Sequence, residues 1–288
     1  MARPTKDDLK WAEEYRKTSG KYDRPSVTAD IVALRPAYDE DINWRENPVF
    51  ALEMLFIKRS GRPFKGCWAL PGGFVNKGES IEEGARRELF EETALKATHL
   101  IPTGVFSQPD RDIRGWVISN AFVSIHKRTG DERVEGGSDA ADARWLRLKA
   151  PTINGGHFNL PFYDGNENVF TLSGTYWMED LGGGTVRTIK DNPLAFDHGK
   201  IIIQSLLRML VFDPKKLVLF LLPEKFTLAR YIDIYTYLTW DPDSKKEVNI
   251  PNLRRQLTAV QNPLLEPCDA KEPSGRGHAQ ARLFRRRA

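Results

Sequence analysis

The fold of this chain is decided by residues 73–95, which read GFVNKGESIEEGARRELFEETAL. Ser80 followed three residues later by Glu83 has the pattern of a capping box, which predicts that a helix begins directly after Ser80. The apolar positions then recur every four residues and predict the buried face of the helix: Ile81, Ala85 and Leu89. Residues 73–95 therefore predict a loop followed by an amphipathic helix.

The acidic residues at the end of this helix need a special explanation. Glu88, Glu91 and Glu92 lie in its last turns, where the helix dipole opposes negative charge. Glu88 and Glu92 are also a like-charged pair four residues apart, which costs about 0.2–0.5 kcal/mol. Arg87 can reach Glu91 and relieve part of this repulsion, and a bound Mg²⁺ ion would compensate for the rest. The alternative is an ordinary solvated acidic face.

If Glu79 on the preceding loop folds back, four carboxylates converge. The stretch resembles the Nudix box, GX5EX7REUXEEXGU with U aliphatic, over the 23 residues from Gly73 to Leu95. One position departs from this pattern, because Ala94 stands where the family has glycine. That glycine serves the helix C-terminus, so we expect Ala94 to strain the turn without removing a ligand.

The resemblance implies an enzyme that hydrolyses a nucleoside diphosphate linked to another group. It implies Mg²⁺, with Mn²⁺ as a substitute, held by Glu88, Glu92, Glu91 and the backbone of Gly73. It implies catalytic roles for Glu91, Arg87 and Glu79, with Arg87 orienting the acidic cluster. Glu91 and Glu135 are both candidates for the general base. The metal would neutralise the diphosphate and supply activated water.

Three further stretches resemble the ADP-ribose pyrophosphatase-like branch of that family: residues 63–74, 108–119 and 194–198. The middle stretch places two guanidinium groups and two carboxylates on one loop. Arginine suits phosphate and carboxylate suits ribose hydroxyls, so we expect a substrate-binding loop made by Asp110, Arg111, Asp112 and Arg114. The alternative is a self-paired polar turn before a strand. For His198 we favour a structural role at a helix start.

The rest of the first 214 residues predicts an α+β fold with a mixed, curved sheet. The resemblance specifies it as the α/β/α sandwich of the Nudix fold. Strands are expected at 27–34, 50–57, 117–125 and 143–148, and a second helix at 199–212. Residues 1–22 are expected to form a helical extension packed on the surface. Residues 151–192 are rich in Gly, Asn and Asp and are interpreted as a surface hairpin insertion.

Residues 215–288 differ from the rest in charge. They contain fourteen Lys or Arg and eight Asp or Glu, a formal charge of +6 within a total of +4, which leaves −2 for residues 1–214. Two helices are expected at 228–238 and 250–257, followed by a basic tail. The pattern resembles the winged helix-turn-helix domain of Nudix-related regulators of NAD metabolism that sense ADP-ribose. Double-stranded DNA is the expected partner, bound by Arg254, Arg255, Arg276 and Arg282. The alternative is a packing domain with a solvated tail.

The expected organisation is an extension (1–22), a Nudix domain (23–214) and a winged-helix-like domain (215–288). Two cysteines are too few for a disulfide framework or a zinc site, and no apolar run approaches the ~20 residues of a membrane helix. Together with the charged N-terminus, this predicts a soluble cytoplasmic protein, and the resemblance implies a homodimer. Two functions remain. The first, which we favour because every box carboxylate is present, is a Mg²⁺-dependent hydrolase of ADP-ribose or a related nucleoside diphosphate derivative. The alternative is an ADP-ribose-sensing, DNA-binding transcriptional regulator of NAD metabolism with little or no turnover.

Overall fold

The protein was analysed as a computed structural model, which covers all 288 residues. The structure describes residues 6–18, 20, 23–38, 50–97, 99–126, 134, 137, 140–149, 151–179, 183–190, 192–211, 214–239, 248–259, 264–273 and 280–287. Glu135 and Arg276, two of the predicted functional residues, lie outside these ranges. No helix within the described ranges is long and apolar enough to cross a bilayer.

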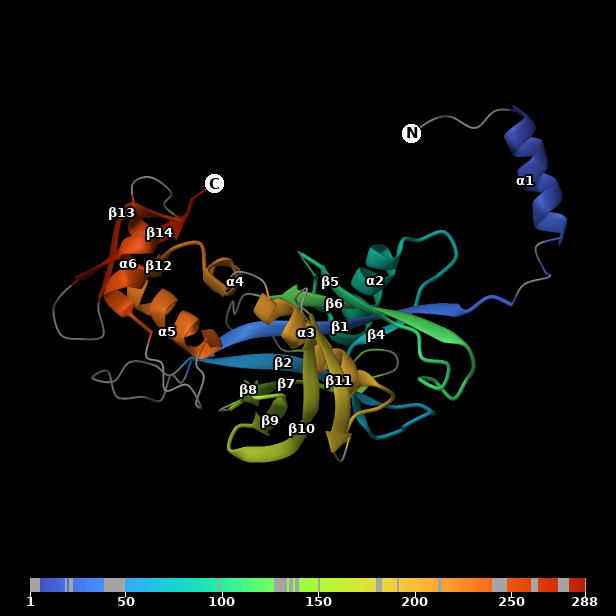
Figure 1. Cartoon of the computed structure of the whole chain (residues 1–288), viewed down its shortest axis with the longest axis horizontal. Helices are drawn as coiled ribbons and strands as arrows, with labels where there is room; N and C mark the ends of the chain where they lie inside the picture. Colours follow the sequence, from blue (N-terminus) through green and yellow to red (C-terminus); the bar gives the residue numbers. More distant parts are fainter. Residues whose placement is uncertain are drawn as a thin grey trace.

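A large mixed sheet forms the body of the molecule (Figure 1). Its strands run in the order β11 (Gly183–Lys190), β10 (Glu167–Glu179), β9 (His157–Asp164), β7 (Ala140–Leu148), β2 (Phe50–Arg59), β1 (Ser26–Tyr38), β6 (Val117–Ile125) and β5 (Ile101–Phe106). Three short strands attach to this path: β3 (Trp68–Ala69) to β2, β4 (Gly72–Phe74) to β1, and β8 (Thr152–Asn154) to β9. Strands β1 and β6 pair in parallel, whereas β1 with β2 and β6 with β5 pair antiparallel.

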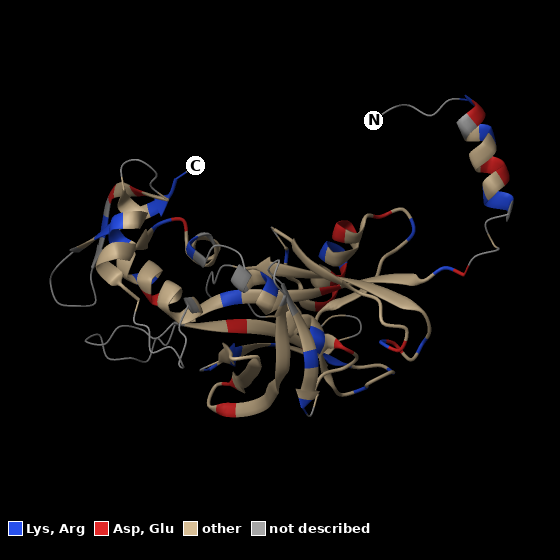
Figure 2. Cartoon of the chain, in the orientation of Figure 1, with Lys and Arg blue, Asp and Glu red and all other residues tan. Residues whose placement is uncertain are grey.

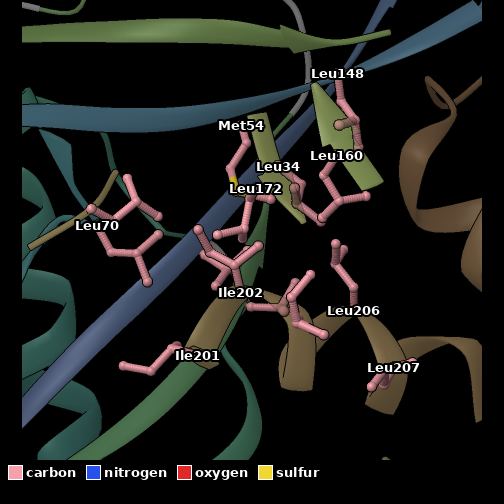
Figure 3. Packing of buried hydrophobic residues seen from close by; sticks show 14 of the residues in the cluster. Leu34, Met54, Leu70, Leu148, Leu160, Leu172, Ile201, Ile202, Leu206 and Leu207 are labelled. Carbon is pink, nitrogen blue, oxygen red and sulfur yellow. The ribbon is translucent and has the colours of Figure 1, made fainter. Parts of the chain in front are cut away.

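Helices cover both faces of the sheet, which confirms the predicted α+β sandwich. Strand β1 shows how this works, because successive side chains of a strand point to opposite faces. Ile31 and Ala33 pack with α2 (Ile81–Thr93) on one face. Val32 and Leu34 pack with α3 (His198–Val211) on the other. Figure 3 shows this second layer, where Ile202 and Leu206 of α3 meet Leu34, Met54 and Leu172 of the sheet.

Residues 151–192 differ from the predicted surface hairpin. Within this segment, β9, β10 and β11 extend the main sheet by antiparallel pairing. Their inward residues are part of the large core, as Phe158, Leu160, Phe162 and Leu172 are at most 2% exposed. The antiparallel pair of β10 and β11 agrees with the expected hairpin, but the alternation of apolar residues along β9 buries the segment instead of leaving it on the surface. Burial of that face outweighs the weak strand propensity of the segment.

The C-terminal unit is built from α4 (Pro214–Leu221), β12 (Phe226–Thr227), α5 (Leu228–Thr239), α6 (Ile250–Thr258), β13 (Leu265–Pro273) and β14 (Gln280–Arg286). The strands form a separate antiparallel sheet in the order β12-β14-β13. Among the described residues this unit consists of three helices and a small sheet, and its assignment as a winged helix stays a prediction. Its core includes Tyr231, Ile234 and Leu257, and it also takes in Leu52 of β2. The unit therefore packs directly on the end of the main sheet.

The N-terminal helix α1 (Lys6–Thr18) forms where it was predicted, but it is not packed on the body. Figure 1 shows it extending away from the sheet. Trp11 and Tyr15 stack on each other, with ring centroids 5.1 Å apart, and both are largely exposed. Its apolar residues are too few to predict a packing partner within the chain.

Candidate active site

The carboxylate helix α2 has the predicted limits. The Ser80 side chain accepts a hydrogen bond from the Glu83 backbone N–H at 3.2 Å, and the Glu83 carboxylate accepts one from the Ser80 N–H at 2.7 Å. Both halves of the capping box are thus present. At the other end Ala94 adopts a left-handed conformation with φ 59°, and its N–H donates to the Phe90 carbonyl at 2.8 Å. The predicted strain at Ala94 is therefore real, since a side chain disfavours this region.

Arg87 gathers the carboxylates that the sequence analysis expected to converge. Its guanidinium donates to Glu79 at 2.7 and 3.1 Å, to Glu88 at 2.8 Å and to Glu91 at 3.1 Å. It also donates to the carbonyl oxygen of Phe74 at 2.9 Å. Glu79 folds back as predicted, and the hydrogen bonds from Arg87 and from the Asn76 N–H lower its pKa to about 2. One cation thus holds three carboxylates at the exposed side of the helix.

Glu92 lies on the inner side of the same cluster and is 5% exposed. Its carboxylate accepts a hydrogen bond from the Gly72 N–H at 2.9 Å. Burial nevertheless raises the pKa of Glu92 to about 8, and burial also raises the pKa of Glu88 despite its contact with Arg87. A buried carboxylate that is ionised at neutral pH needs a nearby positive charge. Glu92 and Glu88 therefore have the character of ligands for a cation.

Gly73 lies so close to Glu88 that a side chain at this position would displace the Glu88 carboxylate. A Cβ atom at Gly73 would lie 2.5 Å from the carboxyl carbon of Glu88. The backbone of β4 is therefore pressed against the carboxylate, as expected if Gly73 takes part in the same site. Within the described ranges, no group of three or more His, Cys, Asp or Glu side chains is already arranged as a metal cage. The donors are nonetheless of the right type, because carboxylate and carbonyl oxygens suit Mg²⁺.

The loop at residues 110–114 is more internally paired than the sequence suggested. Asp112 is buried and accepts from the Arg114 N–H at 2.9 Å and from its guanidinium at 2.6 Å. Burial would raise the pKa of Asp112, but the bonds from Arg114 outweigh it and the net pKa is lowered. Asp110 is exposed. The self-paired turn therefore describes Asp112 and Arg114, although Arg114 remains 40% exposed in its side chain.

Arg111 is placed differently from the expected phosphate ligand. Its side chain is 3% exposed and bonds both oxygens of Asp197, at 2.7 and 3.1 Å. The guanidinium also lies 3.5 Å from Asp30. Because its charge is already compensated inside the protein, we assign Arg111 to holding the loop in place rather than to contacting a ligand. Nothing in the sequence indicated that Arg111 is paired, because Asp197 lies 86 residues away along the chain.

Asp30 is a functional candidate that the sequence analysis missed. It is buried in β1, its carboxylate accepts a hydrogen bond from the Ser119 hydroxyl, and His198 Nε2 lies 3.6 Å from it. His198 is buried, which lowers its pKa, and its Nδ1 accepts the Leu70 N–H at 2.9 Å. His198 thus has the structural role favoured above. A single aspartate within the apolar run 27–34 was the signal available in the sequence.

The arginines predicted to contact DNA lie on the C-terminal unit. Arg254 and Arg255 are exposed on α6, whose opposite face buries Leu253 and Leu257. The helix begins at Asn249, which caps the Asn252 N–H at 2.9 Å. Arg282 is exposed on β14. Figure 2 shows basic residues along this unit, at one end of the main sheet, and acidic residues on α2, which lies apart from it over the sheet.

Comparison with known proteins shows what this chain is similar to. Residues 47–164 match the NUDIX domain family. A stretch of 96 residues is 49% identical to an ADP-ribose pyrophosphatase of Methanocaldococcus jannaschii, covering 33% of this chain and 55% of that protein. The chain therefore spans only about half the length of this curated relative.

Two other similarities extend over most of the chain. An ADPR responsive transcriptional repressor of Acinetobacter baylyi is 24% identical over 240 residues, which cover 81% of this chain and 76% of the repressor. The crystal structure of a MutT/nudix family protein from Enterococcus faecalis is 26% identical, with a TM-score of 0.65, and covers 99% of this chain and 100% of the other. The combination of a sandwich with an appended C-terminal unit is thus present in known proteins.

Proposed function

Because the chain contains a Nudix domain, we propose that it is a divalent metal-dependent hydrolase that cleaves the diphosphate of ADP-ribose or a related nucleoside diphosphate derivative. The observation that carries this proposal is the buried Glu92 beside Glu88, next to a glycine at which a side chain would displace the Glu88 carboxylate. A buried carboxylate beside a second, half-buried one is unfavourable unless a cation offsets their charge. The similarity to an ADP-ribose pyrophosphatase supports the substrate.

In this proposal Glu88, Glu92 and Glu91, with the Gly73 backbone, hold Mg²⁺, for which Mn²⁺ is a substitute. The ion would neutralise the diphosphate and lower the pKa of a bound water. Arg87 orients Glu88 and Glu91 through the hydrogen bonds described above, and Glu79 fixes Arg87 from the other side. Glu91 is 48% exposed in its side chain, so it is accessible as the general base.

The substrate loop acts mainly through Arg114 and Asp110, the two members that remain accessible. Arg111 and Asp112 then support them from inside the protein, Arg111 through Asp197 and Asp112 through its bonds to Arg114. This division follows from charge compensation, since a paired and buried guanidinium gains little from a new phosphate.

The test is turnover of a panel of nucleoside diphosphate derivatives by the purified chain with Mg²⁺. We expect ADP-ribose to yield AMP and ribose 5-phosphate, and Glu92→Gln to abolish the reaction. Glu82→Gln is the matched control, because Glu82 is an exposed carboxylate in the first turn of the same helix. If the wild-type chain hydrolyses no member of the panel, the hydrolase proposal is wrong.

The second candidate function is an ADP-ribose-sensing transcriptional regulator with little or no turnover. It is favoured by the C-terminal unit, where α6 presents Arg254 and Arg255 opposite its buried face. The similarity to an ADPR responsive repressor supports it. As a winged helix, the unit would place α6 in the major groove and the hairpin of β13 and β14 on phosphates.

Retardation of promoter DNA, released by ADP-ribose, tests this second function. Arg254→Ala should weaken DNA binding, whereas Glu92→Gln should leave it intact. A chain that binds no duplex DNA at low salt would exclude it. For either function we propose a homodimer, with a mass in light scattering of twice 32.8 kDa. A mass of 32.8 kDa at micromolar concentration would contradict the dimer.

A further inference from the structure

An open groove of about 610 Å³ lies beside the proposed active site. Two loops line it: Arg62, Pro63, Phe64 and Lys65 on one side, and Ile113 and Arg114 on the other. Its volume is within the range of sites that bind small molecules. Three of its six lining residues are cationic and none is acidic.

Two of the three cations of the groove, Arg62 and Lys65, have no compensating carboxylate among the described residues, whereas Arg114 is paired with Asp112. Within the described part of the chain, neither Arg62 nor Lys65 has an ion-pair or hydrogen-bond partner, and both are exposed. Other arginines of the main domain are ion-paired with carboxylates, as Arg87, Arg111 and Arg144 show. Because the charge of Arg114 is offset by Asp112, the two unpaired cations Arg62 and Lys65 give the groove its net positive charge, which attracts an anion.

Arg114 is held in place before any ligand arrives. Asp112 binds its Nε and Nη2 atoms, and its guanidinium lies over the rings of Phe74 and Phe196 at 4.8 and 5.2 Å. Its Nη1 atom has no hydrogen-bond partner among the described residues. A guanidinium fixed in this way loses little conformational entropy when it binds a phosphate.

The loop that carries Arg62 and Lys65 is also braced. Arg59 donates from Nε to the Pro63 carbonyl at 2.8 Å, and the ring of Phe64 packs edge-on against Phe196 at 4.8 Å. Phe64 and Phe196 both have positive φ, at 61° and 52°. Such backbone conformations persist where the surrounding structure requires them, and they concentrate at ligand sites.

Phe74 joins this groove to the carboxylate cluster. Its ring supports Arg114, and its carbonyl oxygen accepts a hydrogen bond from Arg87. The groove therefore adjoins the carboxylate cluster through Phe74. If the diphosphate of a ligand lies at the carboxylates, the cations of the groove would meet a different part of that ligand.

We propose that the groove defined by Arg62, Lys65 and Arg114 binds a phosphate monoester carried on the sugar of the substrate. The preferred substrates are then nucleoside diphosphate derivatives with an additional phosphate on the ribose, such as ADP-ribose 2′-phosphate. The apolar surface of Pro63, Phe64 and Ile113 fits the sugar or base face of such a ligand. This inference rests on the proposed function for the position of the diphosphate.

Calorimetric binding to the full chain tests the groove without turnover. The probes are AMP, adenosine 2′,5′-bisphosphate and adenosine 3′,5′-bisphosphate, in buffer with a chelator. We expect at least one bisphosphate to bind about tenfold tighter than AMP or better, as charge-assisted bonds to one phosphate allow. The tighter isomer identifies the position of the phosphate.

The Arg62→Gln/Lys65→Gln variant should remove most of this preference, with an unchanged melting temperature. The Lys190→Gln/Lys225→Gln variant is the control, because it removes the same charge from exposed sites outside the groove. The ratio of kcat/KM for ADP-ribose 2′-phosphate over ADP-ribose should fall in the first variant and persist in the second.

The outcomes separate the inference from the proposed function. Equal binding of AMP and both bisphosphates overturns the inference, even if ADP-ribose is hydrolysed. Equal loss of the preference in both double variants overturns the inference as well. The preference would then depend on the net charge of the protein and not on the groove. A preference in binding without any turnover supports the groove and contradicts the hydrolase.

Discussion

Arg87 is the residue on which the geometry of the proposed active site depends. It makes hydrogen bonds to three carboxylates and one carbonyl at once, which requires the planar, forked guanidinium. No single carboxylate on α2 is placed by the helix alone. The raised pKa of Arg87 has the same cause, since these bonds to Glu79, Glu88 and Glu91 stabilise its charged form.

We therefore expect Arg87→Lys to lower kcat by about 10–100-fold, because a lysine can replace only part of this set of charge-assisted bonds, each worth roughly 1.5–3 kcal/mol. Steady-state kinetics on ADP-ribose measure the effect. Arg86→Lys is the control, since the exposed Arg86 guanidinium binds only the Ala97 carbonyl among the described contacts. Equal activity of the two variants would show that Arg87 does not organise the site.

Gly73 is the second residue whose identity follows from contact. We expect Gly73→Ala to reduce activity about tenfold or more, because its Cβ would lie 2.5 Å from the Glu88 carboxyl carbon and must displace it. Gly61→Ala meets nothing within 4 Å and should leave turnover unchanged. Wild-type kinetics in the Gly73 variant would contradict the close approach.

At the scale of elements, helix α2 combines a well-formed start with a strained end. The capping box satisfies its first turn, whereas its last turn ends on an alanine with φ 59°. A left-handed alanine costs roughly 1–2 kcal/mol relative to its preferred conformation. The strain lies two residues beyond Glu92, so the chain tolerates it without moving a proposed ligand.

We expect Ala94→Gly to raise the free energy of unfolding by about 1 kcal/mol, measured by urea denaturation, because glycine adopts positive φ without a steric penalty. Ala259→Gly is the matched control. Ala259 follows helix α6 with φ −61°, so glycine should bring no gain there. A stabilised Ala259 variant together with an unchanged Ala94 variant would contradict the argument.

Strand β9 carries the clearest difference between expected and observed elements. Phe162 is completely buried and packs edge-on against Phe56, with ring centroids 5.1 Å apart. We expect Phe162→Ala to destabilise the protein by about 3–5 kcal/mol in the same denaturation experiment. Asn159→Ala, at an exposed position of the same strand, should cost far less. A small effect of Phe162→Ala would restore the interpretation of residues 151–192 as a surface insertion.

At the scale of the whole molecule, the main sheet and the C-terminal unit share a core. Leu52 of β2 lies among the buried residues of that unit, and the Tyr237 hydroxyl of α5 donates to the Leu148 carbonyl of β7 at 3.1 Å. The difference in charge between residues 1–214 and 215–288 therefore does not mean two independent bodies. A change in the packing of one unit can therefore alter the stability of the other through this contact.

We expect Leu52→Ala to speed amide hydrogen exchange in α4 and α5 as well as in β2, because the lost contact belongs to both units. Mass spectrometry of exchanged peptides measures this. Ile57→Ala is the control, since Ile57 packs in a cluster without residues of the C-terminal unit. Exchange that changes in β2 alone would indicate that the two units are stable independently.

The sequence by itself determined the features that depend on near neighbours along the chain. The capping box, the carboxylates on one helix end, the reach of Arg87 to Glu91 and the strain at Ala94 all involve residues a few positions apart. Fixed helical geometry converts such spacing directly into distance. The family resemblance followed from the same 23 residues, 73–95.

Only the tertiary structure decided the features that join distant residues. The pairing of Arg111 with Asp197 and of His198 with Leu70 depends on how the sheet folds, and so does the groove between the loops of Arg62 and Arg114. Sequence patterns report local propensity and periodicity. The partners of a charged side chain and the lining of a cavity come from distant segments that the fold brings together. For this reason the sequence predicted Arg111 to be a ligand and residues 151–192 to be a surface hairpin insertion, whereas in the structure Arg111 and much of that segment are buried.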